Sequence, residues 1–285
     1  MSPDFSQPLE KGKKLTPQYV DAHIEEFKLM GEYFINYPDL FLDWITPRES
    51  NFRLFPYQRI FLRAMMRYQY LYVVACRAFS KSFITILGAI LRCIFLPGEK
   101  YFIAAPGKGQ GAKIATEKIN EIFSRYPLLK LEVESDTYAN DNVQIKFKNG
   151  SIFDVVRARD STRGGRRHGG IIDEVRDHDG DQLNSVVIPL LNVARREPDG
   201  TLDPTESNQQ QVYITSASSK ASYAYDKLIE LFEQSIIDPS STFVMGCDYR
   251  IPMMHGLLNA EMINKIKMDT TVKEETFAQE YLSLN

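Results

Sequence analysis

The sequence predicts an α/β fold of the P-loop NTPase class (ASCE, RecA-like), in which helices flank a mostly parallel sheet. Three observations support this prediction. Residues 71–82 (LYVVACRAFSKS) form an apolar strand that enters a short loop ending in Lys81-Ser82. Residues 169–175 (GGIIDEV) form a second buried strand that ends in Asp173-Glu174. Strand and helix patterns also alternate over residues 71–126, a rhythm that favours parallel strands.

The chain divides into three expected parts. They are an N-terminal helical extension, a P-loop ATPase core and a small C-terminal lid or linker subdomain, over residues 1–50, 51–222 and 223–285. In the extension, a helix is expected from Thr16-Pro17 to about residue 36, because apolar residues recur every three or four positions. Pro38 and Pro47 then punctuate a connecting segment.

The core elements follow from local pattern. A helix begins near Pro56, and the helix after the P-loop is apolar almost all round, so we expect it to be deeply buried. Asn149-Gly150 lies between two alternating segments and predicts an antiparallel hairpin. The expected strands are residues 71–75, 101–106, 143–158 (as the hairpin), 169–173 and 212–218, and the expected helices after the P-loop are residues 82–95 and 111–126.

Two later segments differ from this core pattern. Residues 197–210 (EPDGTLDPTESNQQ) are polar and rich in turn-forming residues, so we expect a mobile loop. From about Tyr223 the chain reads as a helix, a strand-like FVMGCDY and a last helix that begins near Asn259. We interpret this end of the chain as the lid-like subdomain.

The P-loop motif has a specific chemistry. In such a loop the lysine, here Lys81, reaches the outer phosphates of a nucleotide, and the hydroxyl of Ser82 binds Mg²⁺. Two positions that usually hold glycine carry Ala75 and Ser80 instead. A Cβ at residue 80 crowds the loop unless the backbone there keeps a negative φ. Taken alone, Lys-Ser after a strand also fits an ordinary helix start.

The carboxylate pair strengthens the nucleotide interpretation. In ATPases that cleave the γ-phosphate, the aspartate holds Mg²⁺ and the glutamate activates the attacking water, which are the roles expected for Asp173 and Glu174. An Asp-Glu pair can also cap a following helix. The two motifs occur in the required order, with Lys81 and Asp173 92 residues apart, and together they predict an ATPase.

Composition narrows the class of protein. The 285 residues are 44% hydrophobic, enough for a sizeable core. The three cysteines are far apart and form no CxxC pair, which argues against a disulfide framework or a structural zinc site. The N-terminus lacks an apolar signal core, and no apolar stretch is long enough to span a membrane. We therefore expect a soluble protein.

The net charge of −3 gives no global attraction to nucleic acid, so any DNA contact must be local. Between residues 141 and 168 basic residues outnumber acidic ones. The basic residues are Lys146, Lys148, Arg157, Arg159, Arg163, Arg166 and Arg167. For the lysines we favour a solvated hairpin and loop over a DNA contact. The arginines immediately before the Asp-Glu strand are less easily explained in that way.

Four short motifs together resemble the ATPase domain of the large terminase subunit of tailed bacteriophages. In order, they are PYQR at 56–59, CRAFSKS at 76–82, GGIIDEV at 169–175 and ITSAS at 214–218. The resemblance extends from about residue 50 to the end, because ETFAQEYL at 275–282 is similar to the segment that closes the ATPase region in that family.

The resemblance implies a motor that hydrolyses ATP with Mg²⁺ to drive double-stranded DNA into a procapsid. Its implied partners are the portal protein, the small terminase subunit and further copies of the chain in a ring, and its implied location is the host cytoplasm, with no membrane contact. Complete large terminases continue into a nuclease, so a chain that ends at Asn285 is expected to hold the ATPase domain without the nuclease domain.

The same resemblance assigns further residues. Tyr57 and Gln58 match the nucleotide-binding PYQR motif, in which the glutamine reads adenine. Thr215 and Ser216 match the motif that couples nucleotide state to movement, although either could simply cap a strand end. The remaining nucleotide-binding residues implied are Arg77, Ala78, Phe79, Ser80, Lys81 and Ser82. Arg77 is also the implied γ-phosphate sensor from the same subunit, with a salt bridge as the alternative.

A ring motor also requires a cation from a neighbouring subunit. Arg163, in the sequence STRGGRR, is our first candidate for this catalytic arginine finger, and Arg166 is the second. Both could instead contact DNA phosphates or solvent. An isolated ATPase domain would then hydrolyse ATP slowly, because assembly completes the site.

Two other functions remain open. A helicase-like DNA translocase shares the P-loop, the Asp-Glu pair and the coupling motif, but it would need a second RecA-like domain, and few residues follow residue 218. A nucleotide-binding module that never hydrolyses is favoured only by Ser80 in place of glycine. Changing Glu174 to Gln would separate this module from the enzymes.

Overall fold

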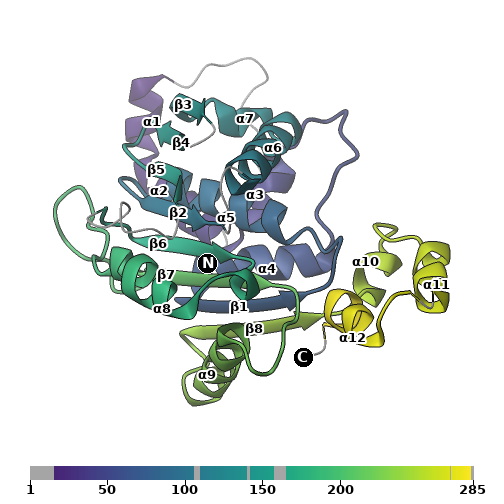
Figure 1. Cartoon of the computed structure of the whole chain (residues 1–285). Coiled ribbons are helices and arrows are strands. Elements are labelled where there is room, and N and C mark those ends of the chain that lie inside the picture. Colours follow the sequence, from purple (N-terminus) through teal and green to yellow (C-terminus); the bar gives the residue numbers. More distant parts are fainter. Residues whose placement is uncertain (1–15, 106–109, 140–141, 157–164, 270, 284–285) are drawn as a thin grey trace.

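A computed structural model describes residues 16–105, 110–139, 142–156, 165–269 and 271–283. In this part of the chain eight strands form one sheet in the order β3-β4-β5-β2-β6-β7-β1-β8 (Figure 1). The strands are β1 Tyr70–Ala75, β2 Lys100–Ala104, β3 Val133–Ala139, β4 Asn142–Phe147, β5 Ile152–Val156, β6 Gly169–Asp173, β7 Gln210–Thr215 and β8 Thr242–Cys247. All pairs from β5 to β8 are parallel, which confirms the predicted fold class.

Helices cover both faces of the sheet (Figure 1). Successive side chains of a strand point to opposite faces, so Leu71 and Val73 join one apolar cluster while Tyr72 and Val74 join another. The first cluster includes α4 Pro56–Arg67, α5 Lys81–Phe95 and α6 Gln110–Arg125, and the second includes α9 Tyr223–Ile237. Burial on both faces explains why the central strands read as continuous apolar runs.

The N-terminal region is more helical than the sequence indicated. The helix expected up to residue 36 is divided at His23 into α1 Pro17–Ala22 and α2 Ile24–Asn36. The segment after it, expected to be a connection, contains α3 Pro38–Ile45. Pro38 occupies the first turn of this helix, where proline needs no amide hydrogen. The buried Asp39 joins α3 to α4 through ion pairs with Arg59 and Arg63.

The predicted hairpin is present as β4 and β5, with Gly150 at φ +83° in its turn. The hairpin is part of the main sheet, because β5 also pairs in parallel with β2. The sequence did not indicate β3, which pairs with β4 and forms the edge of the sheet. Between the hairpin and α6 lies the short helix α7 Pro127–Lys130.

The C-terminal part expected from residue 223 contributes a strand and a helix to the core. Strand β8 pairs in parallel with β1, so the sheet extends to Cys247, and α9 packs on it. Beyond β8, three short helices lie beside the carboxyl end of the strand (Figure 1). They are α10 Arg250–Met254, α11 Ala260–Met268 and α12 Glu274–Phe277, and a π-helical turn at Ala278–Leu282 follows them.

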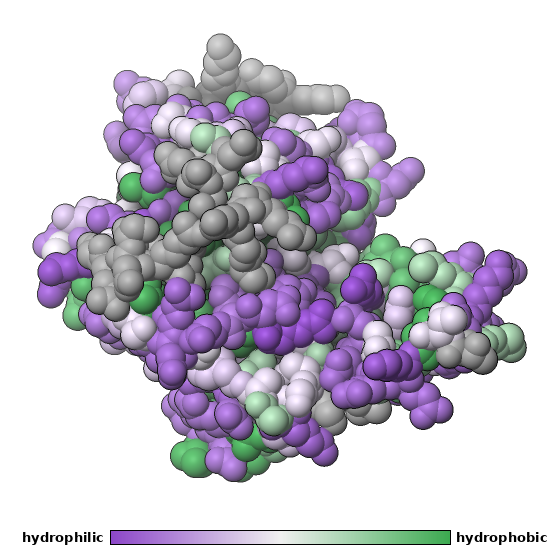
Figure 2. Space-filling view, in the orientation of Figure 1, coloured by the Kyte–Doolittle hydropathy of each residue, from purple (hydrophilic) through white to green (hydrophobic). Residues whose placement is uncertain are grey.

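The view in Figure 2 shows a surface whose centre is mainly hydrophilic. Hydrophobic side chains gather at the lower end of this view, over α9. The exposed apolar residues of α9 are Ile229, Phe232, Ile236 and Ile237. None of the described helices combines the length and apolar character that a membrane crossing requires.

Candidate nucleotide-binding site

The predicted motifs meet at one edge of the sheet. Strands β1, β6 and β7 are parallel neighbours, with Val74 opposite Thr215 and Asp173 opposite Ile214, so their carboxyl ends lie together. Ligands of open α/β sheets bind at this edge. A cavity of about 620 Å³ opens here. It is lined by Cys76, Arg77, Ala78, Phe79, Ser80, Lys81, Ser82, Phe83, Ile114, Lys118, Glu174, Arg176, Asp177, Ser216 and Glu280.

The loop between β1 and α5 has a glycine-type backbone without glycine. Ala78 has φ 61° and Ser80 has φ 66°, both in the left-handed region. The sequence had left open whether residue 80 would keep a negative φ, and it does not. A side chain in this region costs about 1–2 kcal/mol per residue. The loop thus keeps the curvature that lets backbone amides converge on an anion.

Lys81 begins α5, and its ammonium group is held at the strand ends. Its Nζ donates to the carbonyl oxygens of Ala75 at 2.7 Å and Cys76 at 3.3 Å, and to Ser216 Oγ at 3.3 Å. Burial lowers the pKa of Lys81, and the negative charge of Glu174 opposes that shift. The lysine is therefore already directed into the cavity by the end of β1.

Asp173 ends β6 as a buried carboxylate. Burial and, after it, the charge of Glu174 raise the pKa of Asp173 to about 7. Its Oδ1 is buried and has no hydrogen-bond partner among the described residues. An unsatisfied carboxylate oxygen of this kind fits a cation. No cluster of three or more His, Cys, Asp or Glu is found in the described residues, but Mg²⁺ at a phosphate site needs only one or two protein ligands. Asp173 and Ser82 fit that requirement.

Glu174 follows directly and turns the chain with φ 47°. Its carboxylate is partly exposed, at 31%, and lines the cavity. Glu174 Oε2 accepts from the backbone N–H of Ser216 at 3.4 Å and lies 3.8 Å from Arg176 Nε. Ser216 therefore contacts both Lys81 and Glu174. Thr215 lies beside them, buried, and its hydroxyl donates to the carbonyl oxygen of Ser216 at 2.7 Å.

Three further charged residues of the cavity, Arg77, Arg176 and Glu280, form a connected group. Arg77 is 65% exposed, and its Nε donates to Glu280 Oε2 at 2.7 Å. Arg176, from the turn after β6, lies 2.8 Å from Glu280 Oε1. Burial raises the pKa of Glu280, but hydrogen bonds from Arg77 and Arg176 outweigh it and hold the pKa below its usual range. The sequence interpretation missed Arg176 and Glu280, and the spacing DEVR was the only local signal for the former.

Solved structures with this architecture come from phage large terminases. The Thermus phage P74-26 large terminase ATPase domain aligns with a TM-score of 0.55 and 16% identity over 78% of this chain and 92% of that chain. The large terminase from another thermophilic bacteriophage aligns with a TM-score of 0.56 and 11% identity over 89% and 52%, respectively. The chain has the fold of a large terminase ATPase domain.

A third structure, of that second large terminase in complex with ATP-γ-S, aligns with a TM-score of 0.52 and 13% identity over 89% of this chain. The chain spans about half the length of this large terminase, because the alignment covers 52% of it. No protein-family profile and no curated protein sequence matches the chain. The likeness is therefore one of fold, and it confirms the predicted P-loop NTPase class.

Two predicted nucleotide-binding residues do not line the cavity of this terminase fold. Gln58 is buried, and its Oε1 accepts from the backbone N–H of Phe55 at 2.9 Å, which caps α4. Its Nε2 donates to the hydroxyl of Tyr57 at 3.3 Å. The Tyr57 ring in turn packs on Phe79 of the P-loop, with ring centres 4.5 Å apart. Adenine reading by Gln58 stays a prediction.

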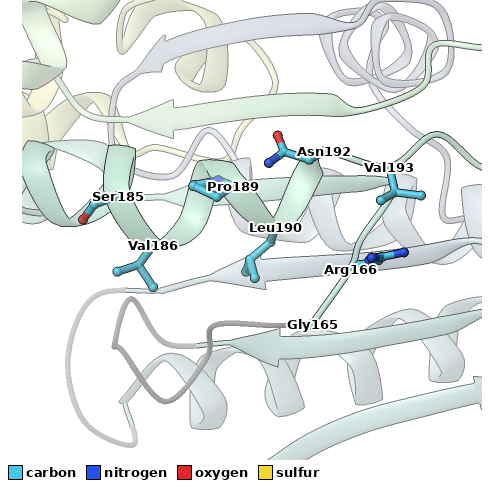
Figure 3. A pocket seen from close by; sticks show the side chains of 8 residues that line it. All are labelled: Gly165, Arg166, Ser185, Val186, Pro189, Leu190, Asn192 and Val193. Atoms are coloured by element: carbon cyan, nitrogen blue, oxygen red, sulfur yellow. The ribbon is translucent and has the colours of Figure 1, made fainter.

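The second candidate arginine finger, Arg166, does not line this cavity. Arg163 is outside the described residues. Arg166 precedes β6 and lines a second cavity of about 750 Å³, together with Ser185, Pro189 and Asn192 (Figure 3). Asp173 lies at the other end of β6, whose five residues span roughly 13 Å at about 3.3 Å per step. Arg167, counted among possible DNA contacts, forms an ion pair with Asp154 of β5.

Proposed function

We propose that the chain is the ATPase motor domain of a genome-packaging large terminase subunit, which hydrolyses ATP to move double-stranded DNA into a procapsid. One observation carries the proposal. Lys81 and Glu174, from motifs far apart in sequence, line one cavity at the carboxyl edge of the sheet, beside the buried Asp173. The fold shared with large terminase ATPase domains supports it.

Each residue would contribute one function to ATP cleavage. The N-terminus of α5 and Lys81 bind phosphate oxygens, because the free amides and the ammonium group both attract negative charge. Asp173 and Ser82 would hold Mg²⁺, which supplies charge neutralisation on the phosphates. Glu174, whose carboxylate is open to the cavity, accepts a proton from the attacking water.

Ser216 would connect this chemistry to movement. Its hydroxyl accepts from Lys81 and its backbone N–H donates to Glu174, so a change at either residue acts on the end of β7. This contact supports the coupling function proposed for Thr215 and Ser216. The alternative, a simple strand-end cap, predicts no effect of Ser216 substitution on DNA movement.

The motor would act as a ring of identical chains on the portal protein, with the small terminase subunit as a further partner, in the host cytoplasm. Arg166 supports a shared site, because it lies at the opposite end of β6 from Asp173 and is exposed. An arginine at that end of the strand cannot reach the nucleotide cavity of its own subunit. Arg163 remains the first candidate for the finger.

The test is Glu174→Gln, measured in wild-type and variant protein at high concentration or assembled on procapsids. We expect Mg²⁺-dependent ATP hydrolysis to fall about 10²-fold or more, since a general base is lost, while ATP binding persists. Glu233→Gln, an exposed change on α9, is the matched control. ATP binding without any hydrolysis by the wild type would favour the non-hydrolysing module instead.

A second measurement separates packaging from helicase action. A motor that moves intact duplex displaces a third strand bound to DNA without separating the two strands beneath it. A helicase-like translocase releases a single strand from the duplex. ATP-dependent strand separation by the chain, abolished in Glu174→Gln, would replace the packaging proposal with the helicase one.

A further inference from the structure

A carboxylate from the C-terminal end of the chain lies in the phosphate cavity. Glu280 lines the cavity and is 14% exposed. One of its oxygens is 2.7 Å from Arg77 Nε, and the other is 2.8 Å from Arg176 Nη2. A single side chain thus neutralises two arginines that face the space where phosphates would bind. These arginines are more than 90 residues apart in the sequence, and Glu280 is far from both.

The segment that carries Glu280 is held by backbone and side-chain hydrogen bonds and by packing of Phe277 on Tyr249. The backbone N–H of Arg77 donates to the carbonyl oxygen of Glu280 at 3.0 Å, and that of Tyr249 donates to Tyr281 at 2.8 Å. Ser283 Oγ donates to the carbonyl oxygen of Cys247 at 2.7 Å. None of the residues in the Ala278–Leu282 turn is fully buried. Of these contacts, only those between Arg77 and Glu280 join the segment directly to the P-loop.

The position of Arg176 indicates which phosphate Glu280 replaces. Arg176 Nε lies 3.8 Å from Glu174 Oε2, and its Nη1 donates to the carbonyl oxygen of Ala217 at 3.3 Å. Glu174 is the residue that would activate water against the outermost phosphate. The Glu280 carboxylate therefore lies on the side of the cavity where the terminal phosphate of a triphosphate would be.

We propose that Glu280 determines specificity for the triphosphate by competing with its terminal phosphate for Arg77 and Arg176. A terminal phosphate carries more charge and more acceptor oxygens than a carboxylate, so it takes both guanidinium groups. A diphosphate does not reach them and leaves Glu280 in place. Only the triphosphate then releases the segment of residues 274–283 from the P-loop. The inference rests on the proposed nucleotide function of the same cavity.

The test is Glu280→Gln, with binding of a non-hydrolysable ATP analogue and of ADP measured by calorimetry. Removing the competing charge should tighten triphosphate binding about 5-fold or more, whereas ADP binding changes less than about 2-fold. Glu275→Gln, an exposed glutamate of the same segment, should change neither affinity. Glu280→Asp keeps the charge and should bind the triphosphate more weakly than Glu280→Gln.

Hydrogen exchange supplies an independent measurement. In the wild type, amides of residues 274–283 should exchange faster with the ATP analogue than with ADP or without nucleotide. In Glu280→Gln they should exchange fast in all three states. Unchanged or weaker triphosphate binding by Glu280→Gln, or equal exchange with both nucleotides in the wild type, would overturn the inference.

A control variant separates this inference from the proposed function. Lys81→Ala should abolish binding of both nucleotides if the cavity binds phosphate. If the wild type binds nucleotide through Lys81 but Glu280→Gln behaves like the wild type, only the competition proposal fails. If the wild type binds no nucleotide, both proposals fail.

Discussion

Both edges of the parallel sheet hold buried charged groups, but these groups are arranged differently at the two edges. At the amino edge, the side chains of Arg92, Glu99, Arg195 and Glu206 are at most 5% exposed. Arg195 donates to Glu206 and Glu197, and Arg92 lies 3.5 Å from Glu99. At the carboxyl edge, the charged groups surround an open cavity, and a carboxylate there is shared between two arginines.

The amino-edge network has a structural consequence. Arg92 Nη1 donates to Ser207 Oγ at 2.9 Å, and the backbone N–H of Arg195 donates to Asn208 Oδ1 at 2.6 Å. These contacts anchor the polar segment 197–210, which the sequence had led us to expect as a mobile loop. The composition of this segment could not reveal its contacts with Arg92 of α5 and with Arg195.

The difference shows which feature identifies a functional edge. Buried polar atoms without a hydrogen-bond partner among the described residues occur at both edges. They are Arg92 Nε, Glu99 Oε2 and Glu206 Oε1 at the amino edge and Asp173 Oδ1 at the carboxyl edge. Backbone strain is more selective. Among the described residues, three of the five non-glycine positions with positive φ, Ala78, Ser80 and Glu174, line the carboxyl-edge cavity. Strain beside an open cavity is typical of a site of chemistry.

The largest expected effect is at the amino edge. Arg195→Met removes the nearer of the two cations paired with buried Glu206 and leaves only Arg92, 3.8 Å away, so we expect a loss of about 3–5 kcal/mol in the free energy of unfolding. Arg196→Met, at the exposed neighbour, should cost little. Denaturant titration measures both. Equal, small losses would mean that the amino-edge network is not structural, and the contrast between the edges would disappear.

The next effect is at the carboxyl edge and depends on pH. The folded pKa of Asp173, about 7, is above the ordinary 3.8, so its contribution to stability is present at low pH and is lost as pH rises from about 4 to 7. At about 1.4 kcal/mol per unit, the wild type loses at most roughly 4 kcal/mol over this range. Asp173→Asn lacks this loss and should be the more stable protein at pH 8.

Denaturant titrations of both proteins between pH 5 and pH 8 measure this difference. Asp181→Asn, at an exposed position of α8 Gly180–Gln182, is the control and should follow the wild type. Parallel stability curves for wild type and Asp173→Asn would show that the carboxylate is satisfied in the folded state. The carboxyl edge would then resemble the amino edge.

The sequence predicted most of the sheet and the centre of the site, for a physical reason. Parallel strands buried on both faces are continuous apolar runs, and the residues that follow them necessarily meet at one edge. Lys81, Asp173 and Glu174 could therefore be found from local pattern alone. The helix at Pro38 was not predicted, because proline occurs both in connecting segments and in the first turn of helices. The packing of α3 on α4, which the local sequence does not show, favours the helix.

Long-range pairing explains the other omissions. FVMGCDY was recognised as a strand, but nothing in it specifies that β8 joins β1. Arg176 and Glu280 meet only because the C-terminal segment returns to the P-loop, and neither has a local signature of that contact. For Gln58, adenine reading stays a prediction; the structure adds that its amide oxygen accepts a backbone N–H at the start of α4, where helices leave such groups unpaired.

The smallest expected effect tests the strain itself. Ser80 and Ser222 both precede helices, but Ser80 has φ 66° and makes no side-chain cap, whereas Ser222 has φ −111° and accepts from the backbone N–H of Tyr225. Ser80→Gly should raise the free energy of unfolding by about 0.5–1 kcal/mol, because relief of the left-handed conformation exceeds the entropy that glycine adds to the unfolded chain. Ser222→Gly should lower it by about 0.3 kcal/mol, the loss of a cap. Paired denaturant titrations give the sign of each change. If both glycine variants are less stable than the wild type, the backbone at residue 80 is not strained. Backbone strain would then no longer distinguish the carboxyl edge from the amino edge.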